Sequence, residues 1–365
     1  NPNVQVLWLA SDKVVIRHID MLNIQKLWLL FGFATFVLII MYFQSELARL
    51  QDSYYKLESK FLLSHAESRS ISSLLPKVVE NDDDDVVVIY NRVPKTGSTS
   101  FVGLAYDLCK KNQYKVLHIN ITANMHVMSL SNQYKFAQNV TRWDAVKPAL
   151  YHGHMAFLNF ERLGTSKKPI YINLIRKPLD RLVSYYYFMR YGDNFRPHLI
   201  RKKHGDKMTF DDCVEKSHPD CDPNNMWLQI PFFCGHAAQC WKPGSRWALE
   251  RAKTNLVVNY LLVGITEEML DFISVLETTL PRFFKGATDL YLSSNKSHLR
   301  QTSAKIPPSA ETVSKIQQSI VWKMENELYE FAIEQFKFVR KKMLTNDPGG
   351  FQSFFYEKIR PKIPL

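Results

Sequence analysis

Residues 85–103 constrain the fold of this chain more than any other stretch, because they join a buried strand to a helix through a short loop. Val86–Tyr90 is a run of apolar, mostly β-branched residues, the pattern of a strand covered on both faces in a parallel sheet. After the loop, apolar residues recur at helical spacing, at Phe101, Leu104, Ala105 and Leu108. Such a connection directs backbone N–H groups and a helix N-terminus toward an anion.

The loop itself carries side chains that suit a phosphate group. Lys95 supplies a positive charge, Gly97 lets the backbone approach closely, and hydroxyl groups follow. The residue order excludes a Walker A loop, in which the lysine follows the second glycine. A generic phosphate loop and a plain strand–helix turn remain alternatives for this stretch alone. The candidate anion-binding residues are Lys95, Thr96, Gly97, Ser98, Thr99 and Ser100.

A second strand–helix connection has the same character. The strand predicted at Pro169–Ile175 ends at Arg176, Pro178 occupies the first position of a helix, and Ser184 lies on that helix. Arginine at a strand end can hold a phosphate through a bidentate fork, although it can equally pair with an acidic neighbour. Two phosphate-binding connections in one chain favour a nucleotide-type ligand.

Two histidines stand at the end of another predicted strand. His152 and His154 are two positions apart, so their side chains point to the same face. Histidine has an unperturbed pKa of about 6.5 and suits the removal of a hydroxyl proton. Two structural histidines are an alternative, and a metal pair lacks an evident third ligand, so no metal is predicted.

The chain as a whole alternates predicted strands and helices, which favours an α/β fold with a parallel sheet flanked by helices. The predicted strands are Val86–Asn91, Lys115–Ile119, Ala149–His152, Pro169–Ile175 and Tyr260–Val263. The predicted helices are Ser98–Lys111, Asn132–Asn139, Pro178–Arg190, Ser245–Leu256, Glu267–Thr279, Ser309–Gln318 and Val321–Leu344.

The N-terminal region predicts a membrane anchor. Residues 27–43 carry no charge, and their length is near the lower limit of about 17 residues for a spanning helix. Basic residues precede the run, so we expect residues 1–26 in the cytoplasm and an uncleaved signal anchor. A buried core helix is the alternative. Residues 44–84 are expected to form a short coiled-coil stem and a charged linker, followed by one luminal domain at 85–365.

Luminal placement agrees with the glycosylation sequons and with the cysteines. We predict glycans at Asn120 and Asn139; a third sequon begins at Asn295. Four of the five cysteines fall close together in a region that reads as loops. In an oxidising lumen we expect local pairs, Cys213–Cys221 and Cys234–Cys240, although four cysteines allow three connectivities. A zinc site lacks the usual ligand spacing.

The formal net charge of +12 implies an acidic partner: nucleic acid, an anionic membrane or an acidic polysaccharide. The predicted anchor and the disulfide-like cysteine spacing oppose nucleic acid.

Several of these segments resemble a known family. The loop Lys95–Ser100 resembles the 5′-phosphosulfate loop of Golgi carbohydrate sulfotransferases, and Arg176 to Ser184 is similar to the 3′-phosphate site of that superfamily. Further segments look like the heparan sulfate 2-O-sulfotransferase family: residues 91–96, 151–154, 182–188, 227–236 and 322–327. The resemblance covers residues 85–362.

This resemblance implies a sulfotransferase fold and 3′-phosphoadenosine 5′-phosphosulfate (PAPS) as the sulfate donor. It implies transfer to the 2-hydroxyl of uronic acid, mainly iduronic acid, in heparan sulfate. It further implies a type II Golgi membrane protein that forms a homotrimer and needs no metal.

Residue roles follow from the same resemblance. His152 would be the general base, Lys95 would stabilise the leaving phosphate, and His154 would orient the acceptor. The polymer would contact Arg92, Tyr106, His118, His154, Arg201 and Arg300. A loop over the donor nucleotide would contribute Tyr291, Ser297, Thr302 and Lys305, which makes a glycan at Asn295 doubtful.

Two positions depart from the family pattern, and other functions remain open. Lys177 stands where aspartate is common, and Ala123 where vertebrate members carry lysine. Uronosyl 2-O-sulfotransferases acting on dermatan or chondroitin sulfate share a segment like 244–253. A catalytically silent glycosaminoglycan-binding protein is a second alternative, and a P-loop kinase is opposed by the missing Walker A order.

Overall fold

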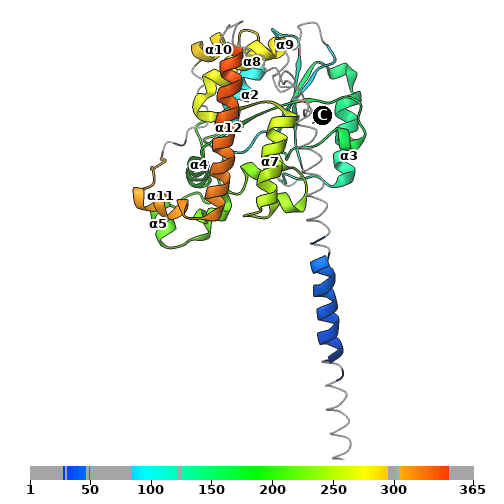
Figure 1. Cartoon of the computed structure of the whole chain (residues 1–365). Coiled ribbons are helices and arrows are strands. Elements are labelled where there is room, and N and C mark those ends of the chain that lie inside the picture. The colour runs from blue at the N-terminus through cyan, green and yellow to red at the C-terminus, as the bar shows by residue number, and fades with distance from the viewer. Residues whose placement is uncertain are drawn as a thin grey trace, which may run out of the picture. The chain divides into compact units, whose positions relative to one another are not determined.

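The computed structural model describes residues 28, 31–46, 49, 84–121, 125–294, 302 and 304–344. The chain divides into two units, Asn1–Ser68 and Arg69–Leu365. In the first unit, residues 31–46 are helical (Figure 1). Across the described ranges, no helix combines the length and the apolar character needed to cross a membrane. The predicted anchor is described only in part, and most of the predicted stem lies outside the described residues.

The second unit is built on a parallel sheet, as the sequence predicts. Its described strands form one five-stranded sheet in the order β2-β3-β1-β4-β5, and every neighbouring pair is parallel. The strands are β1 (Val87–Tyr90), β2 (Lys115–Ile119), β3 (Ala149–Gly153), β4 (Ile170–Ile175) and β5 (Tyr260–Ile265). The predicted strand bounds differ from these by two residues at most.

The two edge strands of the sheet differ in burial. All residues of the inner strands β1 and β3 are buried, whereas the mixed run of β2, at one edge, has exposed residues at Lys115 and His118. β5, at the other edge, is a continuous apolar run and is almost wholly buried, so a continuous apolar run here indicates a strand covered by helices rather than its place in the sheet.

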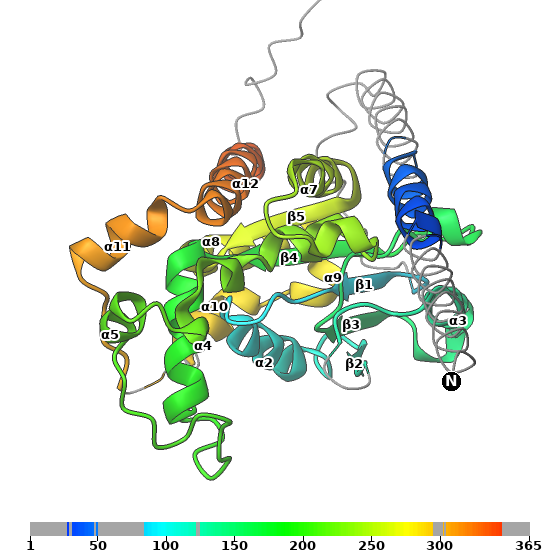
Figure 2. The ribbon, with the colours of Figure 1, turned by 90° about the horizontal axis from the view of Figure 1, so that it is seen from below.

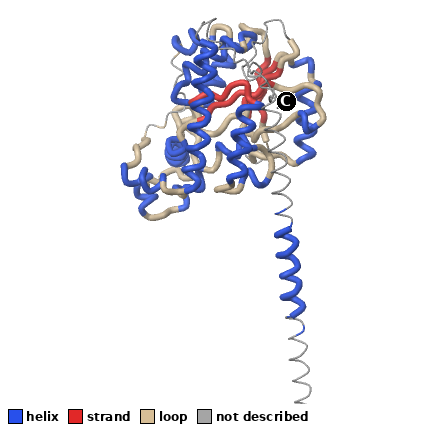
Figure 3. Tube along the Cα trace, in the orientation of Figure 1, coloured by secondary structure: helices blue, strands red, loops and turns tan. Residues whose placement is uncertain are grey.

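Helices cover both faces of the sheet. Figure 2 shows α2 and α10 on one face and α7 and α12 on the other, and Figure 3 shows the strands gathered between them. The predicted helices are present with shifted ends: α2 (Ser98–Leu108), α3 (Leu130–Arg142), α4 (Pro178–Tyr191), α7 (Arg246–Asn259), α8 (Met269–Thr279), α11 (Ala310–Gln317) and α12 (Ile320–Leu344). Phe101 of α2 packs on Tyr90, Phe272 and Phe284, which fixes that helix against the sheet and its neighbours.

The cysteine-rich region differs from the prediction that it is made of loops. It contains the short helices α5 (Phe210–Glu215) and α6 (Gln229–Cys234) and several 3₁₀ turns. Two further short helices, α9 (Pro281–Phe284) and α10 (Ala287–Ser293), were also not predicted. Elements of four to seven residues are too short to show a helical apolar period. Both predicted disulfides, Cys213–Cys221 and Cys234–Cys240, are present and close this region.

The strand order places a reversal next to β1. From β1 the chain proceeds to β2 and β3 on one side, then crosses to β4 and β5 on the other. In open parallel sheets, ligands bind outside the carboxyl ends of the strands at such a reversal. Lys95, His154 and Arg176, three of the predicted site residues, follow the carboxyl ends of β1, β3 and β4.

Candidate active site at the carboxyl edge of the sheet

The loop predicted to bind phosphate, called below the phosphate-binding loop, connects β1 to α2 with its backbone in an unusual conformation. Gly97 has a φ of 73° and precedes the first residue of α2, and no side chain caps that helix. The N–H of Ser100 donates to the carbonyl of Gly97 at 3.1 Å, and no side chain competes with a ligand for the other N–H groups of the first turn. The hydroxyl of Thr96 is buried and donates to the carbonyl of Val93 at 2.9 Å, which holds the loop in shape.

Arg176 joins this loop to the second phosphate-binding connection. It follows β4, and its Nη1 donates to the carbonyl oxygen of Lys95 at 3.1 Å. Burial and the positive charge of Arg176 lower the pKa of Lys305. Because two cations lie close enough to affect one another, the region between them suits an anion.

The remaining residues that were predicted to bind the donor lie in several different elements. Ser184 is half-buried on α4, and Tyr291 is half-buried on α10. The hydroxyl of Thr302 donates to the carbonyl of Gly192 at 3.0 Å, so this hydroxyl ties two loops together. Ser297 and Arg300 lie outside the described residues.

A cavity of about 590 Å³ opens beside the phosphate-binding loop. It brings together five of the six predicted acceptor contacts and the predicted base: Arg92, Tyr106, His118, His152, His154 and Arg201. Thr99 of the phosphate-binding loop also lines it, so the cavity adjoins the predicted donor site. Two residues that the sequence did not single out, His126 and Arg196, also line it, as does Asn120, which was predicted only as a glycosylation site.

His152 lies at the inner end of this cavity. It is 3% exposed, its Nε2 is 3.1 Å from the hydroxyl of Tyr106, and its Nδ1 has no hydrogen-bond partner among the described residues. Burial, together with the nearby Arg92, His118 and His154, lowers the pKa of His152 to about 3, and burial contributes most. The ring is therefore neutral, which is the form that a general base requires.

His154 and His126 form a second pair at the cavity wall. Nδ1 of His154 donates to the carbonyl of Arg92 at 2.8 Å, which leaves Nε2 as the lone-pair atom of the neutral ring. His126 places its Nδ1 3.3 Å from the carbonyl of His154 and stacks on Trp241. No spacing pattern in the sequence points to His126, because its neighbours in the cavity come from distant segments.

Phe188 of α4 contacts both Lys95 and Arg201. The ammonium of Lys95 lies 4.3 Å from the centre of its ring, and the guanidinium carbon of Arg201 lies 4.2 Å from the same centre. Nε and Nη2 of Arg201 make no hydrogen bond among the described residues, although Nη2 lies 3.9 Å from a buried carboxylate oxygen of Asp193. The guanidinium therefore keeps hydrogen-bond donors that an anionic ligand could use.

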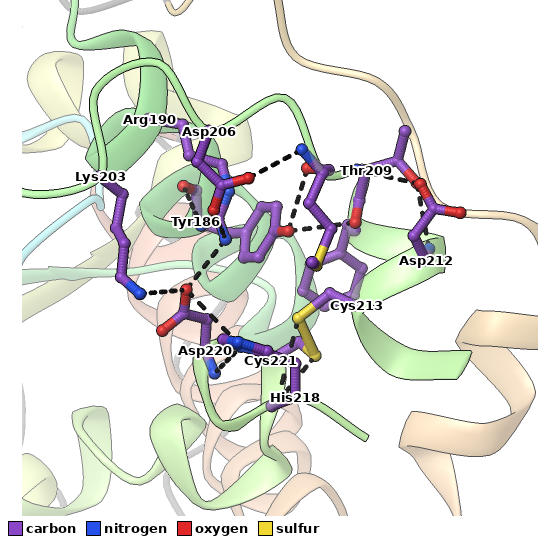
Figure 4. Close-up of polar contacts among 12 residues, drawn as sticks. Tyr186, Arg190, Lys203, Asp206, Thr209, Asp212, Cys213, His218, Asp220 and Cys221 are labelled. Atoms are coloured by element: carbon purple, nitrogen blue, oxygen red, sulfur yellow. Dashed lines mark hydrogen bonds and ion pairs between the residues drawn. A yellow bond between two sulfur atoms is a disulfide. The ribbon is translucent and has the colours of Figure 1, made fainter. Parts of the chain in front are cut away.

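The loop that supplies Arg196 and Arg201 is fastened to α4 by a buried ionic cluster (Figure 4). Arg190 of α4 is 1% exposed, and its Nη2 is 2.8 Å from a carboxylate oxygen of Asp206 and 2.9 Å from one of Asp220. Two carboxylates on one guanidinium compensate the cost of burying its charge.

The same cluster extends to the first disulfide. Lys203 lies 3.3 Å from Asp220, and the hydroxyl of Tyr186 lies 3.0 Å from the carbonyl of Met208. Asp220 immediately precedes Cys221, whose bond to Cys213 closes the segment (Figure 4). Both ends of the loop at 192–209 are thereby held.

The predicted glycosylation sites occupy different surroundings. Asn139 is exposed on α3. Asn120 is exposed too, but it also lines the cavity, so a glycan there would lie beside the acceptor residues. Within the described ranges, no group of three histidine, cysteine or acidic side chains is arranged to hold a metal.

Comparisons with known proteins agree with this geometry. A family model described as "Sulfotransferase family" matches residues 81–332. A "Heparin sulfate O-sulfotransferase" from Drosophila melanogaster is 64% identical over 280 residues, which cover 77% of this chain and 80% of that protein. A "Heparan sulfate 2-O-sulfotransferase 1" from Xenopus laevis is 54% identical, over 90% of this chain and 94% of the relative. The protein of that name from Homo sapiens is 51% identical, over 91% and 96%.

Proposed function

This chain belongs to the sulfotransferase family, and we propose that it transfers sulfate from PAPS to the 2-hydroxyl of uronic acid in heparan sulfate. The observation that carries the proposal is the cavity in which His152 and three arginines adjoin the phosphate-binding loop. The relatives named for this reaction, at 51% identity and above, support the acceptor.

The chemistry is divided between two sides of the site. PAPS supplies an activated sulfuryl group whose bond to the 5′-phosphate breaks during transfer. Nε2 of His152 takes the proton of the attacking 2-hydroxyl as its oxygen bonds to sulfur. Lys95 and the N-terminus of α2 stabilise the negative charge on the departing phosphate. Arg176 and Lys305 hold the 3′-phosphate of the donor.

The acceptor is recognised by charge. Arg92, Arg196 and Arg201 line the cavity and suit the carboxylate and sulfate groups of a glycosaminoglycan. His118, Tyr106 and His154 add hydrogen-bonding groups around the reacting hydroxyl. We propose iduronic acid as the main acceptor sugar.

Segment 244–253, which resembles uronosyl 2-O-sulfotransferases acting on dermatan or chondroitin sulfate, does not favour that acceptor. Arg246 and Lys253 in this segment each lie 2.6 Å from the carboxylate of Glu327 on α12. These cations are therefore engaged in an interhelical ion-pair cluster, and neither lines the cavity.

We also propose a type II Golgi membrane protein anchored by residues 27–43, with Asn139 glycosylated and the chain assembled as a homotrimer. The uncharged run and the two disulfides support the luminal placement. Carbonate extraction of membranes, glycosidase digestion and sedimentation of the purified full chain test these three statements separately.

The experiment for the function uses the full chain with ³⁵S-labelled PAPS and three acceptors: N-sulfated heparosan, desulfated heparin and dermatan sulfate. We expect label on the 2-hydroxyl of uronic acid in the heparan-type acceptors. Label confined to dermatan sulfate would assign the chain to the uronosyl branch. Donor binding without labelled product would favour the silent glycosaminoglycan-binding protein.

A further inference from the structure

The end of β4 lacks a strand neighbour on one side. Pairing of β4 with β1 stops at Ile172, opposite Tyr90, and pairing with β5 stops at Ile175. The next residue, Arg176, has both its backbone groups bound by one side chain, that of Gln229 at the start of α6. Its N–H donates to Oε1 of Gln229 at 2.9 Å, and its carbonyl accepts from Nε2 of Gln229 at 2.9 Å. The amide of Gln229 thus replaces a strand neighbour.

A buried carboxylate fixes which way this amide faces. Oε2 of Glu325 on α12 accepts from Nε2 of Gln229 at 3.3 Å, and Oε1 accepts from the backbone N–H of Leu228 at 2.9 Å and of Ile230 at 3.1 Å. Gln229 and Glu325 are both fully buried. The carbonyl of Arg176 and the carboxylate of Glu325 are both hydrogen-bond acceptors. The N–H₂ group of Gln229, and not its oxygen, must therefore face them.

We propose that Gln229, oriented by Glu325, is a positioning residue for Arg176 and so for the donor. Arg176 reaches the phosphate-binding loop through its bond to the carbonyl of Lys95, so a displacement of its backbone would disturb both phosphate sites. This inference rests on the proposed function, because it assigns Arg176 to the donor. Glu267 supports the same turn, since its carboxylate accepts from the N–H of Lys177 at 3.2 Å.

Two substitutions separate this role from general packing. Gln229→Met keeps the length of the side chain and removes both bonds to Arg176. Glu325→Gln keeps an oxygen for the N–H groups of Leu228 and Ile230 but turns an N–H₂ group toward the N–H₂ group of Gln229. Rotating Gln229 would not help, because its oxygen would then face the carbonyl of Arg176. Glu330→Gln, on the exposed face of α12, is the matched control.

The measurement is the affinity of the full chain for the donor product, 3′-phosphoadenosine 5′-phosphate, by calorimetry, together with the KM for donor and for N-sulfated heparosan. We expect the product Kd and the donor KM to rise about tenfold in both variants, from the loss of buried hydrogen bonds at the site. The acceptor KM should change less than about twofold, and Glu330→Gln should match the wild type.

A purely structural role would lower kcat through a smaller active fraction and leave both KM values unchanged, which would overturn the inference. Equal product binding by the wild type and both variants would overturn it too, while leaving the proposed function intact. Failure of both variants to fold, with Glu330→Gln folded, would assign the pair to folding instead. A wild type that does not bind the product would overturn the proposed function and this inference with it.

Discussion

His152 is buried beside cationic and titratable neighbours, and that environment sets its protonation. Arg92 and two histidines surround a ring that is 3% exposed, so its charged form is disfavoured. A neutral ring can accept a proton, but the low pKa also makes it a weak base. An anionic donor and a carboxylate-bearing acceptor would add negative charge and raise that pKa in the complex.

Removal of this ring should abolish turnover without affecting the donor site. For His152→Ala we expect kcat to fall by about 10² to 10⁴-fold, the usual contribution of a positioned base. Affinity for 3′-phosphoadenosine 5′-phosphate should stay within about twofold of the wild type, measured by calorimetry. Full turnover by this variant would remove His152 from the role of base.

The lowered pKa of His152 also predicts how stability depends on pH. An unfolded histidine protonates near pH 6.5, whereas the folded ring stays neutral to about pH 3, so acid favours the unfolded chain. The contribution of this ring is present above pH 6.5 and is lost as the pH falls. Between pH 6.5 and 5 the loss has an upper limit of about 2 kcal/mol.

Urea unfolding at several pH values tests this statement. The difference in unfolding free energy between pH 6.5 and 5 should be smaller in His152→Asn than in the wild type, because asparagine does not titrate. An identical pH dependence in the two proteins would contradict a lowered pKa at this position.

At the scale of elements, the loop at 192–209, which supplies Arg196 and Arg201 to the cavity, is held in place by residues outside the loop. Asp220 lies beyond α5, yet it pairs with Arg190 on α4 and with Lys203 in the loop (Figure 4). The capping box of Thr209 and Asp212 fixes the start of α5 just after the loop. The arginines of the cavity are therefore placed by neighbouring elements.

Loss of the charge on Asp220 should weaken the acceptor side alone. In Asp220→Asn we expect the acceptor KM to rise about five- to tenfold, because Arg190 and Lys203 each lose a charged partner. Product binding should be unchanged. Asp222→Asn is the control, since Asp222 caps the N–H of Asn224 and asparagine caps equally well. A parallel loss of donor and acceptor binding would instead indicate a general loosening of α4.

At the scale of the whole molecule, the charge of +12 and the arginine-lined cavity predict salt-sensitive binding of polyanions. Each phosphate- or sulfate-like contact releases counterions, so the logarithm of affinity falls linearly with the logarithm of salt concentration. Heparin affinity should follow this law.

One arginine of the cavity should account for about one unit of that slope. For Arg201→Ala we expect a heparin-binding slope smaller by about one than in the wild type, measured by titration at several salt concentrations. Lys323→Ala removes the same charge from an exposed position on α12 that does not line the cavity. Equal slopes for Arg201→Ala and the wild type would exclude Arg201 from polymer contact.

The sequence by itself determined the parallel α/β architecture, both disulfide pairs, the placement of Lys95 and Gly97 between β1 and α2, and that of His152 and His154 at the end of β3. Each of these depends on residues close together along the chain, such as the strand Val86–Tyr90 followed by Lys95 and Gly97. Backbone sterics and apolar periodicity act over a few residues, so their effects can be predicted from the local sequence.

Only the tertiary structure decided which distant residues meet. His126, Phe188 and Arg196 carry no local pattern, and Gln229 and Glu325 are separated by 96 positions. Their contacts arise because parallel strands bring the ends of separate segments to one edge, and because helices pack over that edge. Burial then set the pKa of His152, since desolvation depends on everything that surrounds a group in space.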